Sequence, residues 1–250
     1  SLSRLKTMRI RLTLIILLLM KSFDAAAQLD IQFPAADGLM INAKWYPVSD
    51  KMPVMLLCHQ NRYSSGEYIE TAIKLNKFGF NCLALDQRVG GEVNGIVNKT
   101  AELAMKKGLA PEFLDAAQDI TAAIDYLYNK YHKQIILVGS SYSASLSLVL
   151  ANKNPKVLAV IAFSPGEYFP EKSYVKDHMA GFDKPLLAIS SLAESSSVKT
   201  LIADASSVIK TQYIPSNAGE HGSKVLWSTY KGNHEYWVVL MNFLDKIRFL

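Results

Sequence analysis

One serine of the chain stands among small residues where a strongly apolar run gives way to helix-like spacing. The run 135–138 is followed by Gly139, then by Ser141 two places on and Ser143 two places beyond that. A nucleophilic serine on a tight strand-to-helix turn needs small residues at both flanking positions, because the backbones there nearly touch. Gly139 meets this need and Ser143 meets it less well, so the pattern is G-x-S-x-S in place of G-x-S-x-G. We predict that Ser141 is a nucleophile; the alternative is a serine that only caps the helix.

The backbone after Ser141 would assist the same chemistry. The N-terminus of a helix favours negative charge, and the N–H of Tyr142 is placed to donate to an oxyanion beside the serine. An activated serine also needs an imidazole within hydrogen-bond reach, and a carboxylate that holds the imidazole in the right tautomer. The five histidines of the chain therefore have to be judged by where the fold places them.

The elements that would position these residues follow from hydrophobic periodicity. Residues 29–47 alternate apolar and polar around Asp37-Gly38, which predicts a hairpin of two half-buried strands. Continuous apolar runs then predict strands buried on both faces at 54–58, 80–85, 135–138, 157–163, 186–189 and, more weakly, 208–214. Helix-like spacing occupies 68–77, 111–131, 143–152, 198–205 and 234–249. This order predicts a three-layer α/β/α sandwich whose eight-stranded sheet is mostly parallel after an antiparallel N-terminal hairpin. We expect one domain over residues 28–250.

Three segments of the chain together resemble the α/β-hydrolase superfamily, nearest to its small dienelactone-hydrolase-like and esterase members. They are residues 57–61, 85–91 and 138–144. The resemblance implies that the backbone N–H of Asn61 is the second oxyanion donor beside that of Tyr142. It covers nearly all of the chain after residue 27 and implies the α/β-hydrolase fold.

The same loops depart from the family pattern at two positions. Gln60 stands where the family has the glycine of His-Gly, and Val89 stands where it has the first glycine of a D-x-R-G-x-G-like turn. We interpret His59 as a histidine that organises its loop. Asp86 and Arg88 are interpreted as a structural ion pair of the loop.

The resemblance also implies the chain order Ser, Asp or Glu, His for a catalytic triad. His221 lies in a glycine-containing loop beyond the last apolar run, and this loop resembles the family's catalytic-histidine loop. His234 instead precedes the C-terminal amphipathic stretch, with Asn233 as a helix cap. We therefore favour His221 as the base, and we expect His132 and His178 at the surface.

Two carboxylates compete for the role of the acid. Glu194 follows the apolar run 186–189 at the position where the family places its Asp or Glu. Glu167 follows the run 157–163, from which some members supply the acid. We favour Glu194 and keep Glu167 as the alternative.

The first residues of the chain resemble an export signal. Arg9 and Arg11 precede an apolar run at 12–20, and Ala25-Ala26-Ala27 follows it. Such a run is shorter than the roughly 20 residues that a membrane-spanning helix needs. We therefore expect residues 1–27 to be a signal peptide that is removed, and the protein to be periplasmic or secreted with no stable membrane anchor.

Charge and cysteine content argue against several other classes of protein. The chain carries 27 Lys and Arg against 22 Asp and Glu, and five of these basic residues lie within the first 27 positions. The remainder is close to neutral, which gives no indication of nucleic-acid binding. Cys58 and Cys82 both lie in apolar runs and are expected to be inert core thiols. No metal-ligand spacing appears in the sequence, and we expect no metal or organic cofactor.

The combined prediction is an exported serine hydrolase that cleaves carboxylic esters through an acyl-enzyme held by a Ser-His-Glu triad. Only residues 167–184 separate two predicted strands where family lids usually insert, so little or no cap is expected. An open site suits small or polymer-linked esters, with an apolar wall from Tyr168, Phe169, Tyr174 and Phe182. Two alternatives remain: a serine peptidase of the prolyl-oligopeptidase type, and an inactive hydrolase fold used for binding.

Overall fold

The structure is a computed structural model that describes residues 28–248 and residue 250. The predicted signal peptide, residues 1–27, lies outside the described residues. Among the residues that are described, no helix is long and apolar enough to cross a membrane.

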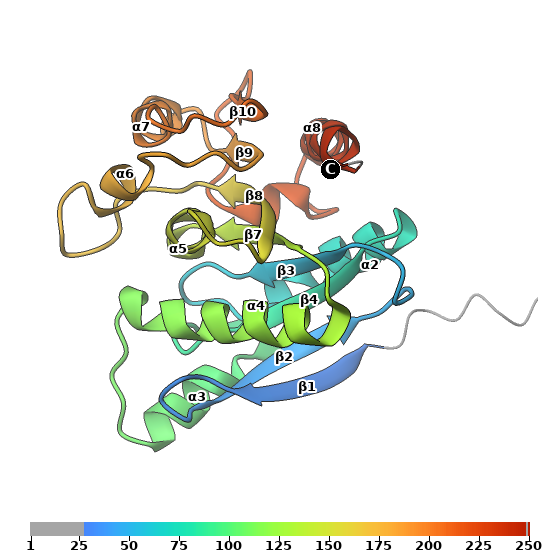
Figure 1. Cartoon of the computed structure of the whole chain (residues 1–250), viewed down its shortest axis with the longest axis vertical. Coiled ribbons are helices and arrows are strands. Elements are labelled where there is room, and N and C mark those ends of the chain that lie inside the picture. Colours follow the sequence, from blue (N-terminus) through green and yellow to red (C-terminus); the bar gives the residue numbers. More distant parts are fainter. Residues whose placement is uncertain (1–27, 249) are drawn as a thin grey trace, which may run out of the picture.

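A single eight-stranded sheet forms the middle of the molecule (Figure 1). Its spatial order is β1-β2-β4-β3-β7-β8-β9-β10. β1 pairs antiparallel with β2 and β2 antiparallel with β4, whereas all pairs from β4 and β3 onward are parallel. The strands are β1 (Leu29–Pro34), β2 (Met40–Tyr46), β3 (Val54–Cys58), β4 (Asn81–Asp86), β7 (Ile135–Ser140), β8 (Val157–Phe163), β9 (Leu186–Ile189) and β10 (Lys210–Tyr213). The predicted mixed sheet with an antiparallel start is confirmed.

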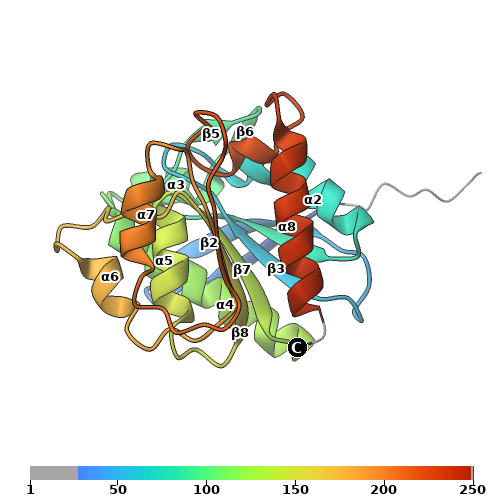
Figure 2. The same ribbon diagram turned by 90° about the horizontal axis from the view of Figure 1, so that it is seen from above.

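Helices cover both faces of the sheet, which is plain when the molecule is seen from above (Figure 2). One face carries α2 (Ile69–Lys77) and α8 (Asn233–Ile247); the other carries α3 (Lys99–Lys106), α4 (Ala117–Tyr131), α5 (Tyr142–Ala151), α6 (Tyr174–His178) and α7 (Ser195–Leu201). Side chains of a strand point alternately to the two faces. In β3, for example, Leu56 packs into the core under α4 and α5, while Leu57 packs into the core under α2 and α8. The apolar runs that form β3, β4, β7, β8 and β9 are therefore buried on both sides, as predicted. The weaker run 208–214 is not: β10 lies at the edge of the sheet and is only partly buried.

Several short elements were not predicted from periodicity. They are α3, α6 and the two-residue strands β5 (Glu92–Val93) and β6 (Ile96–Val97), which pair with each other in a small hairpin. Each is too short to show a clear period, and the polar residues of α3 hide its amphipathic face. The connection between β8 and β9 holds only the single-turn helix α6, in line with the expectation of little or no cap.

Both cysteines lie in neighbouring strands of the buried sheet. Cys58 in β3 and Cys82 in β4 are free thiols with no exposed surface. Burial raises the pKa of both thiols far above the ordinary range, and a protonated thiol is a poor nucleophile. The prediction that both cysteines are core thiols is confirmed.

Candidate active site

Ser141 sits on a strained turn at the carboxyl end of the sheet. It follows β7 directly and precedes the first residue of α5. Its backbone adopts φ 59° and ψ −125°, a conformation that residues with a side chain rarely take. The turn is held by a hydrogen bond of 2.8 Å from the Ser141 N–H to the Phe163 carbonyl at the end of β8. The hydroxyl is therefore presented at the edge of the sheet, and the residue is only 8% exposed.

At this turn the backbone of Gly139 lies close to the backbone of the first turn of α5. A Cβ at this position would lie 2.4 Å from the Ser143 carbonyl oxygen and 2.6 Å from the Ala144 Cα, so no larger residue fits without moving the helix. Ser143 itself is accommodated because its hydroxyl donates to the His59 carbonyl at 2.5 Å and accepts from Gln87 at 2.5 Å. At the position of the second glycine of G-x-S-x-G, the Ser143 side chain thus makes two buried hydrogen bonds.

Glu194 and His221 meet although 27 residues separate them in the chain. The Glu194 carboxylate lies 2.5 Å from His221 Nδ1. Glu194 precedes α7, just beyond the end of β9, and His221 lies in the loop between β10 and the 3-10 helix η3 (Ser223–Leu226). Because the strands of this half of the sheet are parallel, both loops lie at the carboxyl edge where Ser141 stands.

The environment of Glu194 keeps it ionised. Burial alone would raise its pKa, but hydrogen bonds from His221, Ser164 and Ser191 outweigh burial and lower the pKa of Glu194 to about 2. A carboxylate bonded to Nδ1 fixes that nitrogen as the donor and leaves Nε2 as the basic nitrogen of a neutral imidazole. His221 is 39% exposed at its side chain, so an incoming substrate can reach it.

The loop of His221 is fastened to residues beside Ser141. The Gly222 N–H donates to Ser164 Oγ at 3.0 Å, and the Ser223 N–H donates to Ser140 Oγ at 3.0 Å. No hydrogen bond joins Ser141 Oγ to His221 within residues 28–248. Such bonds are often long in unliganded hydrolases and shorten when substrate binds.

Glu167, the alternative acid, is engaged elsewhere. Its carboxylate accepts hydrogen bonds of 2.9 Å from the backbone N–H groups of Val175 and Lys176. Both donors lie in the first turn of α6, whose exposed N–H groups need such acceptors. Glu167 therefore caps α6, and the structure places Glu194, not Glu167, against His221.

Two backbone N–H groups near Ser141 have no acceptor within the chain as described. Tyr142 opens α5, so its N–H has no intrahelical partner. The Gln60 N–H donates to the Glu67 carboxylate at 2.8 Å, which leaves the N–H of Asn61 as the next available donor of that loop. These are the two donors expected for an oxyanion hole.

His59 organises the loop in front of Asn61. Its Nδ1 bonds the Gln60 carbonyl at 2.8 Å, and its Nε2 accepts from the Gln87 N–H at 3.1 Å. Burial lowers the pKa of His59, so the imidazole is neutral, and this single tautomer satisfies both bonds. The interpretation of His59 as a loop-organising residue agrees with these contacts.

The predicted ion pair between Asp86 and Arg88 is wrong. The Arg88 guanidinium binds Asp119 in α4 and Asp37 in the β1–β2 turn, each at 2.7 Å. Asp86 instead accepts from the backbone N–H groups of Ser65 and Lys99. Asp86 and Arg88 are two residues apart at the end of β4, but their side chains bind different neighbours. These neighbours come from distant parts of the chain.

An apolar hollow approaches Ser141 through two tyrosines: Tyr168 is one of its lining residues and its hydroxyl lies close to Ser141, and Tyr142 packs behind the lining residue Phe113. It has a volume of about 450 Å³ and is lined by Val89, Pro111, Glu112, Phe113, Leu114, Tyr168, Phe169 and Pro170. Phe113 stacks on Tyr142 with a centroid distance of 4.6 Å. Burial raises the pKa of Tyr168 to about 12, and the nearby Ser141 hydroxyl opposes this rise. Of the four aromatic residues expected at the wall, Tyr168 and Phe169 line the hollow. Tyr174 does not, although it packs edge-on against Phe169, and Phe182 is wholly buried in the core.

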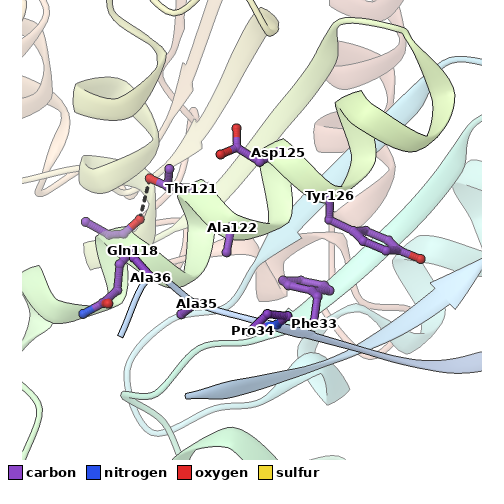
Figure 3. Close-up of a pocket in the computed structure, with 10 residues that line it drawn as sticks. Phe33, Pro34, Ala35, Ala36, Gln118, Thr121, Ala122, Asp125 and Tyr126 are labelled. Carbon is purple, nitrogen blue, oxygen red and sulfur yellow. Dashed lines mark hydrogen bonds between the residues drawn. The ribbon is translucent and has the colours of Figure 1, made fainter. Parts of the chain in front are cut away.

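A more spacious hollow, of about 660 Å³, lies away from Ser141 between the end of β1 and α4 (Figure 3). Its lining is mostly small and apolar, and its one carboxylate, Asp125, is paired with Lys156 at 2.7 Å. Nothing in that lining can activate a nucleophile. The smaller hollow, whose lining residue Tyr168 lies close to Ser141, is the candidate substrate site.

No group of three or more His, Cys, Asp or Glu side chains that could hold a metal ion occurs in the described part of the chain. The arrangement around Ser141 has the groups that acyl transfer through a serine would need: a serine on a strained turn, a histidine bound to a carboxylate, and backbone N–H groups without an acceptor among the described residues.

Two residues of this site were not predicted from the sequence. Ser164 bridges Glu194 and the His221 loop, and the buried Glu67 contacts both the Gln60 and Ser223 segments. Ser164 follows a predicted buried strand, and its position at the carboxyl end of that strand is a signal that could have identified it. No local pattern marks Glu67, because its partner Ser223 is 156 residues away.

Comparison with known proteins gives one family match and several structural matches. The family model described as serine aminopeptidase, S33, matches residues 50–224. No curated protein matches the sequence. The esterase Pf2001 of Pyrococcus furiosus is similar in structure, with a TM-score of 0.66 and 15% identity over 88% of this chain and 92% of that one.

Two further solved structures are similar over most of this chain. A dienelactone hydrolase from Anabaena variabilis has a TM-score of 0.69 and 13% identity, covering 89% of this chain and 98% of that one. The acylaminoacyl peptidase of Pyrococcus horikoshii has a TM-score of 0.61 and 17% identity, covering 91% of this chain but only 43% of the peptidase. At these identities the likeness concerns the fold.

Proposed function

Because this chain belongs to the serine aminopeptidase S33 family of α/β hydrolases, we propose that it is a serine hydrolase that cleaves carboxylic esters through an acyl-enzyme. The observation that carries the proposal is the contact of 2.5 Å between Glu194 and His221 Nδ1 at the same sheet edge as the strained Ser141. Nucleophile, base and acid follow in the chain order of α/β hydrolases.

Each residue has a defined part in the proposed reaction. Ser141 Oγ attacks the ester carbonyl carbon while His221 Nε2 takes its proton, and Glu194 stabilises the imidazolium that forms. The N–H groups of Tyr142 and Asn61 donate to the oxyanion. His221 then protonates the leaving alcohol. Water, deprotonated by His221, then attacks the acyl carbon; the bond to Ser141 Oγ breaks, His221 returns the proton to Oγ, and the acid is released.

The hollow lined by Tyr168 favours an ester with a small apolar group. Seven of its eight lining residues are apolar or aromatic. The eighth, Glu112, uses its carboxylate to accept a backbone N–H of the 3-10 helix η2 (Phe113–Ala116). A site for the ammonium group of a peptide N-terminus needs a carboxylate that is free to bind it. The esterase reading is therefore preferred to aminopeptidase activity.

Covalent labelling tests the proposal directly. Purified protein comprising residues 28–250 is treated with a fluorophosphonate probe and assayed with p-nitrophenyl acetate and butyrate. We expect labelling and turnover in the wild type, and loss of both in Ser141→Ala, because the probe reacts only with an activated serine. Aminoacyl p-nitroanilides assayed in parallel measure peptidase activity. A folded wild-type protein that neither labels nor turns over any substrate would show that the fold serves binding instead.

A further inference from the structure

A buried carboxylate links the two loops that flank Ser141. Glu67 lies in the 3-10 helix η1 (Ser65–Tyr68) and has no exposed surface. One carboxylate oxygen accepts the Gln60 N–H at 2.8 Å, and the other accepts the Ser223 hydroxyl at 2.6 Å. Gln60 directly precedes Asn61, and Ser223 is two residues beyond His221. Glu67 therefore joins the loop of an oxyanion donor to the loop of the base.

The same carboxylate also reaches the strand that carries the nucleophile. The Ser140 hydroxyl lies close enough to Glu67 to oppose the rise of its pKa, and it accepts the Ser223 N–H at 3.0 Å. Ser140 directly precedes Ser141. Glu67, Ser140 and Ser223 thus form a polar cluster that connects the nucleophile strand with both loops. None of the three lines the hollow where substrate would bind.

Burying an ionised carboxylate costs free energy unless hydrogen bonds or a nearby positive charge stabilise it. Burial raises the pKa of Glu67, and the hydrogen bonds from Ser223, Gln60 and Ser140 oppose the rise, as does the charge of His221. Among the described residues no cation lies within ion-pair distance of Glu67. The charge of Glu67 acts on Lys224 from beyond ion-pair distance, and Lys224 is itself paired with Glu220 at 2.9 Å. The buried titratable neighbours Tyr68 and Cys58 are neutral at ordinary pH because burial raises the pKa of each.

We infer that Glu67 is a positioning residue that holds the Asn61 and His221 loops in register with Ser141. The inference rests on the proposed function. A neutral side chain of the same shape could keep the contacts with Gln60 and Ser223, but it would lose the strength of hydrogen bonds to a charged acceptor. Both oxygens of Glu67 accept hydrogen bonds, which is the pattern of an ionised carboxylate, so the substitution would also remove a negative charge that favours the imidazolium of His221 during attack.

Two variants separate the charge from the link between the loops. Glu67→Gln removes the charge and keeps the shape, whereas Ser223→Ala removes only the connection to the His221 loop. Glu70→Gln is the matched control. Glu70 lies three residues after Glu67 and also accepts hydrogen bonds from a residue far along the chain, namely from the Ser228 N–H and hydroxyl at 2.8 and 3.0 Å, but Glu70 is at the surface. Circular dichroism and melting temperature establish that each variant is folded.

Steady-state kinetics and hydrogen–deuterium exchange are measured on the same samples. We expect Glu67→Gln and Ser223→Ala to lower kcat about tenfold or more with KM changed less than twofold. We also expect faster exchange in residues 59–63 and 215–223. In Glu67→Gln alone, the acid limb of the kcat/KM profile should move to lower pH, which loss of packing would not cause. Glu70→Gln should match the wild type throughout.

The results distinguish failure of the positioning role from failure of the proposed function. Wild-type kcat in Glu67→Gln, or unchanged exchange in both loops, would overturn the inference. If Glu67→Gln does not fold, Ser223→Ala decides by the same two measurements. If the wild type is itself inert toward esters and the fluorophosphonate probe, the proposed function fails, and exchange in the two loops still decides whether Glu67 positions them.

Discussion

Glu194 is the residue whose surroundings most clearly set its charge. Beyond His221, its carboxylate accepts hydrogen bonds from the Ser164 hydroxyl at 2.8 Å and from the Ser191 hydroxyl and N–H at 2.8 and 3.0 Å. Hydrogen bonds to a carboxylate favour its ionised form. A fixed negative charge behind Nδ1 is what the imidazolium formed during attack on an ester requires.

Replacing Glu194 by Gln should lower kcat by about 10³- to 10⁴-fold, since the amide can no longer fix the productive tautomer of His221. Turnover of p-nitrophenyl acetate at pH 7.5 measures the loss. Glu167→Gln is the control and should stay within threefold of the wild type, because Glu167 caps α6. Equal losses in the two variants would contradict the assignment of the acid.

The same substitution should change how stability depends on pH. The folded-state pKa of Glu194 is about 2, below the ordinary value of 4.5. A lowered pKa stabilises the fold fully above the unfolded-state pKa, and this contribution disappears as pH falls through the folded-state value. The melting temperature of the wild type should therefore exceed that of Glu194→Gln at pH 7, and the gap should close between about pH 5 and pH 2. A gap that is constant over this range would contradict the pKa assignment.

At the scale of the element, the turn between β7 and α5 depends on one glycine. A methyl group at Gly139 would collide with backbone atoms of the helix at 2.4 and 2.6 Å, and backbone cannot rotate away as a side chain can. We expect Gly139→Ala to destabilise the protein by about 1–3 kcal/mol and to lower the fluorophosphonate labelling rate. Urea unfolding followed by fluorescence measures the first effect.

Ser143→Gly is the informative companion to Gly139→Ala. It restores the glycine pattern of the family yet removes the buried bonds to the His59 carbonyl and to Gln87. The loss of buried partners should cost about 1–3 kcal/mol without the collision. If Ser143→Gly proves more stable than the wild type, the two bonds do not account for the serine.

The elements themselves were largely predictable from the sequence. Buried parallel strands show as continuous apolar runs, and the structure has strands within or across every run that was identified, including the weak one that became β10. Periodicity failed where elements are short: α6 has five residues and β5 and β6 two each. A stretch of that length contains too little of a period to distinguish a helix or strand from a turn.

At the scale of the whole molecule, the order of the elements predicts which loops meet but not which side chains touch. The carboxyl ends of parallel strands share one edge, so Ser141, Glu194 and His221 could be expected to gather there. The ion-pair partners of Arg88 and the contact of Glu67 with Ser223 are different, because these partners lie 31 to 156 residues away and depend on how helices and loops pack onto the sheet. Sequence spacing carries no information about that packing.

The N-terminal segment bears on where the whole protein is located. We propose that residues 1–27 direct the protein out of the cytoplasm and are removed after Ala27, since the basic residues, the apolar run and the small residues follow the order of a signal peptide. Free and wholly buried cysteines such as Cys58 and Cys82 are compatible with an oxidising compartment, because a thiol that solvent does not reach forms no disulfide there. The full sequence expressed in a Gram-negative bacterium should yield protein in the periplasm or medium that begins at Gln28.

Replacing Ile16 and Leu18 by Arg interrupts the apolar run and should keep the protein in the cytoplasm with its N-terminus intact. Glu70→Gln, outside this segment, should be exported like the wild type. N-terminal sequencing of each cell fraction distinguishes the outcomes. Uncleaved wild-type protein in the membrane fraction would show that the segment anchors the chain, and uncleaved protein in the cytoplasm would show that it is not an export signal.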